Sequence, residues 1–167
     1  MKISVIYFSE TGGTGRVAEF IAGGARAAGD TEVRLFNLKS GVDADFVNDC
    51  AAVIFGTPTY CAGMCWQMKK WFDTDRGVRL GGKLGAVFAT ENSSNGGGAE
   101  AAILSVVTHL LVKGMLVYSS GTEFGKPFIH IGPAVVRKNI PEKEELCDLF
   151  GRRIALKAHA LFGASSR

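Results

Sequence analysis

A buried strand that runs directly into a glycine-rich turn and then a helix dominates the start of the chain. Residues 2–8 read Lys-Ile-Ser-Val-Ile-Tyr-Phe, a run of β-branched and aromatic side chains that is typical of a buried strand. Residues 9–15, Ser-Glu-Thr-Gly-Gly-Thr-Gly, end this run, and apolar residues then recur at helical spacing from Val17. Because the unpaired amides at the start of a helix attract anions, this arrangement predicts an anion site.

The turn has the chemistry of a site for a single phosphate group. Ser9, Thr11 and Thr14 provide hydroxyl donors, and the glycines let the backbone approach phosphate oxygens closely. No Lys follows the glycines as in the P-loop of nucleotide triphosphatases, so the turn does not predict a metal-bound triphosphate. An ordinary Gly/Ser/Thr-rich connection explains the same residues, and the turn alone leaves both explanations open.

Composition limits the class of protein. With 167 residues, 47% of them hydrophobic, the chain is expected to form a single domain spanning residues 1–167. The net charge of +3 is small and scattered, which predicts no nucleic-acid partner. No stretch approaches the roughly 20 apolar residues of a membrane span, and no leader peptide is recognisable, so we expect a cytoplasmic protein without membrane insertion.

The four cysteines are expected to be reduced thiols. Cys61 and Cys65 are the only close pair, and they lack the second Cys or His pair that a zinc site needs. We therefore predict no metal site and no catalytic cysteine.

The rest of the chain alternates strands and helices. Alternating polar and apolar residues predict an edge strand at residues 32–37. Apolar runs predict strands at residues 50–55, 86–90 and 114–118, with Gly56 and Pro58 expected to end the third strand. Helical periodicity predicts helices at residues 64–73, 99–112 and from Pro141 to Gly163, whereas residues 41–49 suggest a connection or short helix and residues 119–139 show no period. This pattern predicts an α/β protein: a three-layer α/β/α sandwich around a five-stranded parallel sheet.

Three loops rich in glycine and hydroxyl side chains follow predicted strands, at residues 9–15, 56–63 and 90–98. Ligands of such sheets bind at the carboxyl ends of the strands, where the strand order reverses. The three loops converge there only if the strand order is 2-1-3-4-5. One phosphate-binding loop and two loops for a flat heterocycle together suggest FMN.

These residues resemble the flavodoxin superfamily. Ser9, Thr11, Gly12 and Thr14 match its Ser/Thr-x-Thr-Gly-x-Thr phosphate signature. More narrowly, the chain resembles the tryptophan-repressor-binding-protein-like NAD(P)H:quinone oxidoreductases in short segments at residues 55–60, 63–64, 67–69, 72–73, 82–84, 96–98 and 114–115. The similarity covers most of residues 1–125, whereas residues 126–140 depart from that branch.

The resemblance implies an FMN-binding oxidoreductase that takes a hydride from NAD(P)H as co-substrate and passes two electrons to a quinone-like acceptor. The flavin performs such chemistry, so no catalytic side chain is expected. Loop packing is an alternative role for Tyr60. The cofactor-binding residues that we expect are Ser9, Glu10, Thr11, Gly12, Gly13, Thr14, Pro58, Thr59, Tyr60, Cys61, Ala62, Gly63, Thr90, Glu91, Asn92, Gly96 and Gly97.

The second hypothesis is a flavodoxin-type electron carrier without a substrate of its own. Against it, residues 90–98 lack the aromatic residue with which shuttle flavodoxins usually stack the flavin, and they carry little acid. Lys126 and His130 follow the fifth predicted strand, and a cation near the flavin would favour two-electron chemistry, although His130 alone is equally well explained as a structural residue. Two other functions are excluded. The chain lacks the compact cysteine cluster that an iron–sulfur flavoprotein needs, and its third predicted strand does not end in the Asp that a phospho-receiver domain requires.

The sequence also predicts self-association. At 100° per residue, Trp66 lies about 200° from Met64 and therefore opposite the apolar stripe of its helix. The helix at residues 99–112 is apolar on more than one side. Because the branch that the chain resembles is tetrameric, we expect a homodimer or homotetramer with Trp66 beside a flavin site. Packing of Trp66 under residues 119–139 of the same chain is the alternative.

Overall fold

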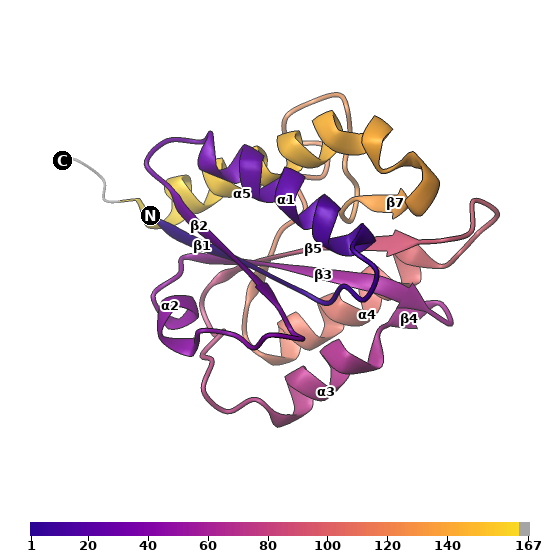
Figure 1. The fold of residues 1–167 in the computed structure, drawn as a ribbon. Coiled ribbons are helices and arrows are strands. Elements are labelled where there is room, and N and C mark those ends of the chain that lie inside the picture. The colour runs from indigo at the N-terminus through magenta and orange to yellow at the C-terminus, as the bar shows by residue number, and fades with distance from the viewer. Residues whose placement is uncertain (164–167) are drawn as a thin grey trace.

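A mostly parallel sheet forms the middle layer of the molecule (Figure 1). The computed structural model describes residues 1–163, and residues 164–167 of the expected domain lie outside them. The strands are β1 (Lys2–Tyr7), β2 (Glu32–Asn37), β3 (Ala52–Tyr60), β4 (Gly63–Met64), β5 (Leu84–Glu91), β6 (Leu116–Val117) and β7 (Ala134–Val136). The main path through the sheet runs β2-β1-β3-β5-β6. Counted along these five strands, it is the predicted order 2-1-3-4-5, and the predicted three-layer fold is confirmed.

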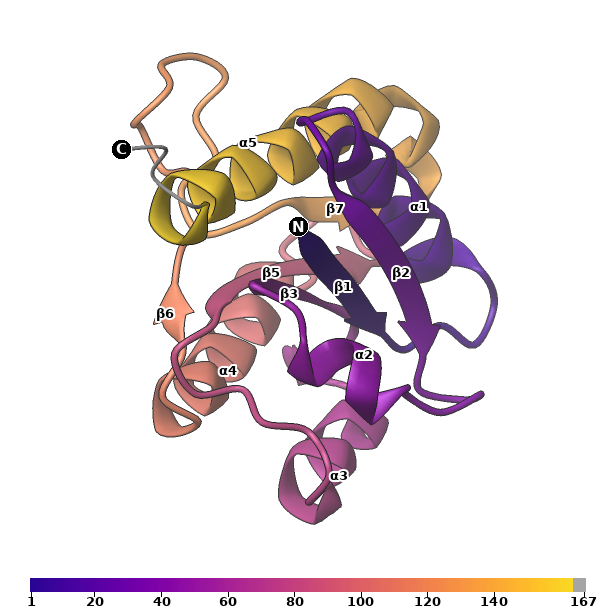
Figure 2. The same ribbon diagram turned by 90° about the vertical axis from the view of Figure 1, so that its left-hand side faces the viewer.

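Helices cover both faces of the sheet (Figure 2). On one face lie α1 (Gly13–Arg26) and α5 (Glu144–Phe162), and on the other lie α2 (Ala44–Asn48), α3 (Trp66–Thr74) and α4 (Ala99–Val112). Each face has its own apolar core, centred on Phe88 and Phe150 under α1 and α5 and on Phe55 and Met68 under α3 and α4. Residues of the central strands β1, β3 and β5 alternate between the two cores, which explains why these three strands are largely apolar. Within residues 1–163, no helix has the length and hydrophobicity needed to cross a membrane.

The third strand is longer than the sequence predicted. β3 continues through Gly56 and Pro58 to Tyr60, so our expectation that these residues end it was wrong. Pairing with β1 stops at Tyr7 and Gly56, whereas pairing with β5 continues to Pro58 and Thr90. Beyond Gly56, β3 therefore has no strand paired on its β1 side. Pro58 can occupy this part of the strand because its missing N–H breaks no hydrogen bond to β1.

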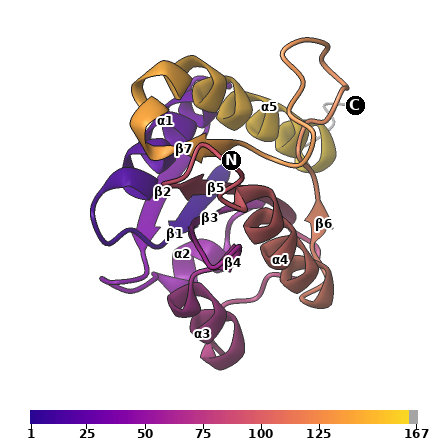
Figure 3. The same ribbon diagram turned by 90° about the vertical axis from the view of Figure 1, so that its right-hand side faces the viewer.

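The fifth strand is divided, and the sheet contains seven strands rather than five. β6 pairs with the start of β5 at Leu84 and Gly85, the chain then leaves the sheet, and β7 pairs with the end of β5 from Ala89 to Glu91. The intervening loop projects beside α5 (Figure 3). Buried Arg153 of α5 holds it there by donating hydrogen bonds to Ser120 Oγ at 3.2 Å and to the Pro127 carbonyl at 2.9 Å.

The helices differ from the predictions mainly at their ends. α4 has the predicted bounds, but α3 begins at Trp66 because Met64 belongs to the short hairpin of β3 and β4. Two 3₁₀ turns, η1 (Arg137–Asn139) and η2 (Pro141–Lys143), precede α5, so Pro141 opens a 3₁₀ turn rather than the α-helix. Residues 134–139, expected to be irregular, are in fact β7 and η1.

Candidate functional site

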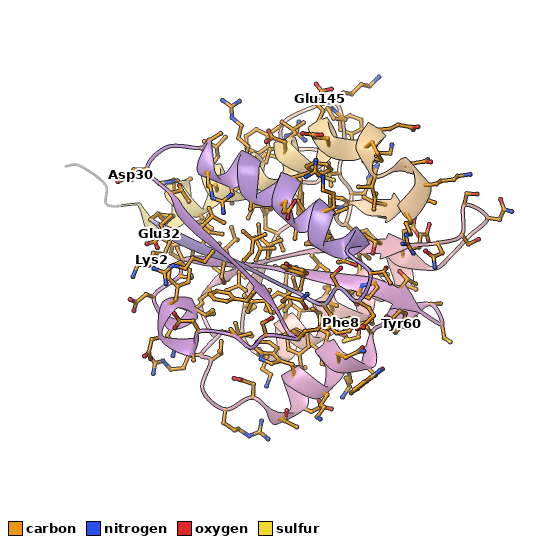
Figure 4. The ribbon with its side chains drawn as sticks, viewed as in Figure 1. Lys2, Phe8, Asp30, Glu32, Tyr60 and Glu145 are labelled. Atoms are coloured by element: carbon orange, nitrogen blue, oxygen red, sulfur yellow. The ribbon has the colours of Figure 1, made fainter. Side chains whose placement is uncertain are left out.

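The candidate site lies at the carboxyl ends of the parallel strands. In Figure 4, Tyr60 at the end of β3 lies at the opposite end of the sheet from Lys2 and Glu32, which begin β1 and β2. A pocket of about 210 Å³ opens there. Its lining comes from the turn after β1, the ends of β3 and β5, and the segment after β7: Ser9, Glu10, Thr11, Gly13, Thr14, Pro58, Thr59, Tyr60, Thr90, Glu91, Asn92, Arg137 and Ile140.

The turn after β1 presents unpaired backbone amides to this pocket. Gly12 has φ of +91°, a left-handed conformation that glycine adopts without strain, and α1 begins at the next residue. No side chain caps this helix, and its first turn contains no acidic residue. The amides of the first turn, with the positive end of the helix dipole, are therefore available to an anion.

Two hydroxyl groups that line the pocket are buried without a hydrogen-bond partner among the described residues. They are Ser9 Oγ in the turn after β1 and Thr59 Oγ1 near the end of β3. Unsatisfied buried polar groups are rare because each costs free energy. Both hydroxyls are therefore candidates to bind a polar or anionic ligand in the pocket.

A hydrogen bond between two other hydroxyls joins the turn to the sheet. Thr14 Oγ1 lies 2.8 Å from Thr90 Oγ1, and both side chains are buried. The bond connects the first turn of α1 to the end of β5, two segments far apart in the sequence. It fixes the position of the first turn of α1 relative to the strand ends.

The β3–β4 hairpin forms another wall of the site. Cys61 and Ala62 occupy its two-residue turn with φ of 49° and 59°, a conformation unusual for residues other than glycine. Thr57 Oγ1 supports the hairpin from below, because it accepts a hydrogen bond from the Cys65 amide at 2.9 Å. Cys61 and Ala62 of the turn are exposed and do not line the pocket. Tyr60, which precedes them, is 42% exposed and does line it.

The loop after β5 is anchored by a carboxylate and packs against that hairpin. Glu91 Oε2 accepts a hydrogen bond from the Ala99 amide at 3.0 Å, so it satisfies the start of α4. A Cβ on Gly98 would lie 2.6 Å from Ala62 Cβ, which shows how closely the two loops approach. We expected Glu91 to bind the cofactor; it lines the pocket, and one of its carboxylate oxygens is committed to α4.

The pocket brings together most, but not all, of the predicted residues. Gly12 lines an adjoining groove instead, together with Arg16, Asn37 and Lys39. The remaining predicted residues lie in the hairpin turn and the loop after β5 but do not line the pocket: Cys61, Ala62, Gly63, Gly96 and Gly97.

Arg137 and Ile140 line the pocket, and the sequence analysis missed both. The apolar triplet at residues 134–136 signals a short strand, and a residue directly after a strand of this sheet lies at the ligand-binding edge. Lys126 and His130, which we considered as cations near a flavin, belong to the projecting loop and do not line the pocket. The cation of the pocket is Arg137.

Comparison with known proteins identifies the family. The family model described as flavodoxin matches residues 5–118, which include the turn after β1 and the ends of β3 and β5. The chain belongs to the flavodoxin family. The predicted resemblance is thereby confirmed, and it makes this protein a flavoprotein of the electron-transfer type.

Relatives of this flavodoxin-family chain include both carriers and enzymes. A flavodoxin of Clostridium saccharobutylicum is 46% identical over 97% of this chain and 100% of its own length. An NAD(P)H dehydrogenase (quinone) of Geotalea uraniireducens is 34% identical over 70% of each chain. The solved structure of a flavodoxin, WrbA-like protein from Agrobacterium tumefaciens superimposes with a TM-score of 0.70 at 26% identity, covering 95% of this chain and 98% of that one.

Proposed function

We propose that this protein binds FMN at the pocket between β1, β3 and β5 and carries electrons in the manner of a flavodoxin. The observation that supports this proposal most strongly is the pair of buried, unpartnered hydroxyls of Ser9 and Thr59 beside the free amides of α1. A phosphate group matches this set of donors without a metal ion.

The residues have separable roles in this proposal. The turn of Ser9 to Thr14 holds the phosphate. Tyr60, at the end of β3, lies along the flavin ring, and Asn92 closes the opposite side of the pocket. Bound FMN supplies the redox centre, which exchanges electrons with another molecule. Burial raises the pKa of the Tyr60 phenol above its usual value, with smaller contributions from Cys65 and Glu10, so this residue remains an uncharged wall of the site at neutral pH.

A carrier now has stronger support than an enzyme, which reverses the order of our sequence-based hypotheses. The flavodoxin relative is 46% identical to this chain, whereas the quinone dehydrogenase of Geotalea uraniireducens is 34% identical over 70% of its own length. An NAD(P)H dehydrogenase (quinone) of Archaeoglobus fulgidus matches along 98% of its own length, but at only 29% identity. A carrier needs only a bound flavin with an accessible edge, and the pocket lined by Tyr60 and Asn92 is open to solvent.

The second candidate is the NAD(P)H:quinone oxidoreductase that the sequence suggested. Two observations favour it: relatives described as NAD(P)H dehydrogenase (quinone), and the presence of Arg137 in the pocket lining beside Glu10 and Glu91. A cation beside a flavin favours the anionic, fully reduced cofactor and hence two-electron chemistry.

One experiment separates the two functions. The purified protein, reconstituted with FMN, is mixed with NADH or NADPH, with and without benzoquinone, and flavin and nicotinamide absorbance are recorded. A carrier is reduced slowly by either nucleotide and turns over rapidly only when a flavoprotein reductase is added. Rapid, quinone-dependent NAD(P)H oxidation by the protein alone would establish the enzyme instead.

A further inference from the structure

We propose that Arg137 is the counter-charge for the phosphate of FMN and makes the site select FMN over riboflavin; this inference rests on the proposed FMN binding. The turn of residues 9–15 contains no basic residue of its own, and it contains the acidic Glu10. A phosphate group carries a charge of about −1.5 to −2 at neutral pH. The amides and the dipole of α1 favour this charge, and a basic side chain that adds a full positive charge has to come from elsewhere in the fold.

The position of Arg137 places it against the phosphate turn. β7 pairs with β5 up to Glu91 and Val136, so the next residue, Arg137, leaves the sheet at its ligand-binding edge. A Cβ on Gly13, the first residue of α1, would lie 4.0 Å from Arg137 Cγ and 3.5 Å from Ile140 Cδ1. The segment after β7 thus packs on the start of α1, and Arg137 lines the pocket there.

The other charged groups around the site are already paired. Lys39 Nζ lies 3.1 Å from Glu10 Oε1, and Arg16 Nη1 lies 3.2 Å from Glu19 Oε2. Glu91 accepts the Ala99 amide. Within residues 1–163, no carboxylate lies within salt-bridge distance of Arg137, so its guanidinium is uncommitted.

Lys138, the neighbouring cation, provides a matched comparison. Its Nζ lies 3.4 Å from Ser94 Oγ in the loop after β5, and its side chain does not line the pocket. A guanidinium also offers two parallel donors that match phosphate oxygens, which an ammonium does not. The proposal therefore requires a positive charge at residue 137. A positive charge on the neighbouring Lys138 does not meet this requirement.

The test measures the dissociation constants of FMN and riboflavin for the wild type, Arg137→Gln, Arg137→Lys and Lys138→Gln, after removal of bound flavin. We expect Arg137→Gln to weaken FMN at least tenfold and riboflavin less than twofold. Arg137→Lys should lose less FMN affinity than Arg137→Gln, and Lys138→Gln should bind both ligands like the wild type. Circular dichroism of each apoprotein verifies that the fold is retained.

Salt dependence gives a second readout, which decides the matter if riboflavin binds too weakly for comparison. FMN affinity of the wild type should fall more steeply with ionic strength than that of Arg137→Gln, because the variant lacks one charge contact. Equal losses for FMN and riboflavin, unchanged FMN affinity, unchanged salt dependence, or an equal effect of Lys138→Gln would each overturn the inference. A wild type that binds neither flavin would instead refute the proposed function itself.

Discussion

Single hydroxyl groups carry much of the proposed binding of FMN. Ser9 and Ser4 are both buried, yet only Ser9 lines the pocket, so they form a matched pair. A hydrogen bond to a charged group contributes about 1.5–3 kcal/mol. We therefore expect Ser9→Ala to weaken FMN binding roughly tenfold or more, and Ser4→Ala to leave it unchanged, as measured by flavin fluorescence titration. Similar FMN affinities of the two variants would show that Ser9 does not bind the phosphate.

The cysteines should differ sharply in reactivity. Burial raises the pKa of the Cys50 thiol to about 11 and that of Cys147 to about 12, and it also raises that of Cys65, whereas Cys61 is exposed. A raised pKa leaves little thiolate at neutral pH, so these thiols react slowly. We expect iodoacetamide to modify native protein at Cys61 alone, as read by mass spectrometry, and Cys61→Ser to remain unmodified.

Cys61 and Cys65 are also not expected to act as a redox pair. If FMN is the redox centre, replacing both with Ser should leave flavin reduction within a few-fold of the wild type. Complete loss of electron transfer with FMN still bound would contradict this expectation.

Helices α1 and α5 pack so closely that glycine is needed where they cross. A Cβ on Gly24 would overlap the backbone carbonyl of Asp148, whereas one on Gly23 meets only the Asp148 side chain at 3.6 Å. Gly24→Ala should destabilise the fold by about 2 kcal/mol or more, because the helices must separate. Gly23→Ala should be neutral or stabilising by up to about 1 kcal/mol, since alanine favours the helix. Urea denaturation compares the two, and equal midpoints would show that the crossing is not tight.

Elements with a clear repeating pattern could be predicted, and those defined by pairing could not. The apolar pattern gave α4 its bounds, and the apolar runs predicted the main strands and their order. The extension of β3 through Pro58 depends on where β1 ends, and the divided fifth strand depends on Ala134–Val136 reaching β5. A local pattern does not show which distant strand a segment pairs with. The apolar triplet at residues 134–136 signals a strand, but only its pairing with β5 brings Arg137 to the site, so the three loops could be predicted and Arg137 was missed.

Apolar side chains exposed on one face of the whole molecule still predict a homodimer or homotetramer. Trp66 of α3 is 63% exposed, which contradicts the alternative that it packs under residues 119–139. Leu104 and Leu111 of the adjacent α4 are 49% and 59% exposed, and Figures 1 and 3 show α3 and α4 on the same side of the sheet. Monomers seldom expose such a group of residues.

Light scattering tests this assembly. We expect the wild type to be at least dimeric at micromolar concentration and Trp66→Glu to dissociate. A monomeric wild type would refute the prediction, and an oligomer unaffected by Trp66→Glu would place the interface elsewhere.

FMN is proposed to bind with its phosphate in the turn after β1, and titration of the apoprotein with FMN measures this binding. Thr11 and Thr14 both line the pocket there. We expect one FMN bound per chain, no comparable binding of FAD, and at least tenfold weaker FMN binding by the double variant Thr11→Ala, Thr14→Ala. The variant loses the Thr11 donor to a charged group and the Thr14 hydroxyl that ties the turn to Thr90. Unchanged FMN affinity in a folded double variant would contradict it.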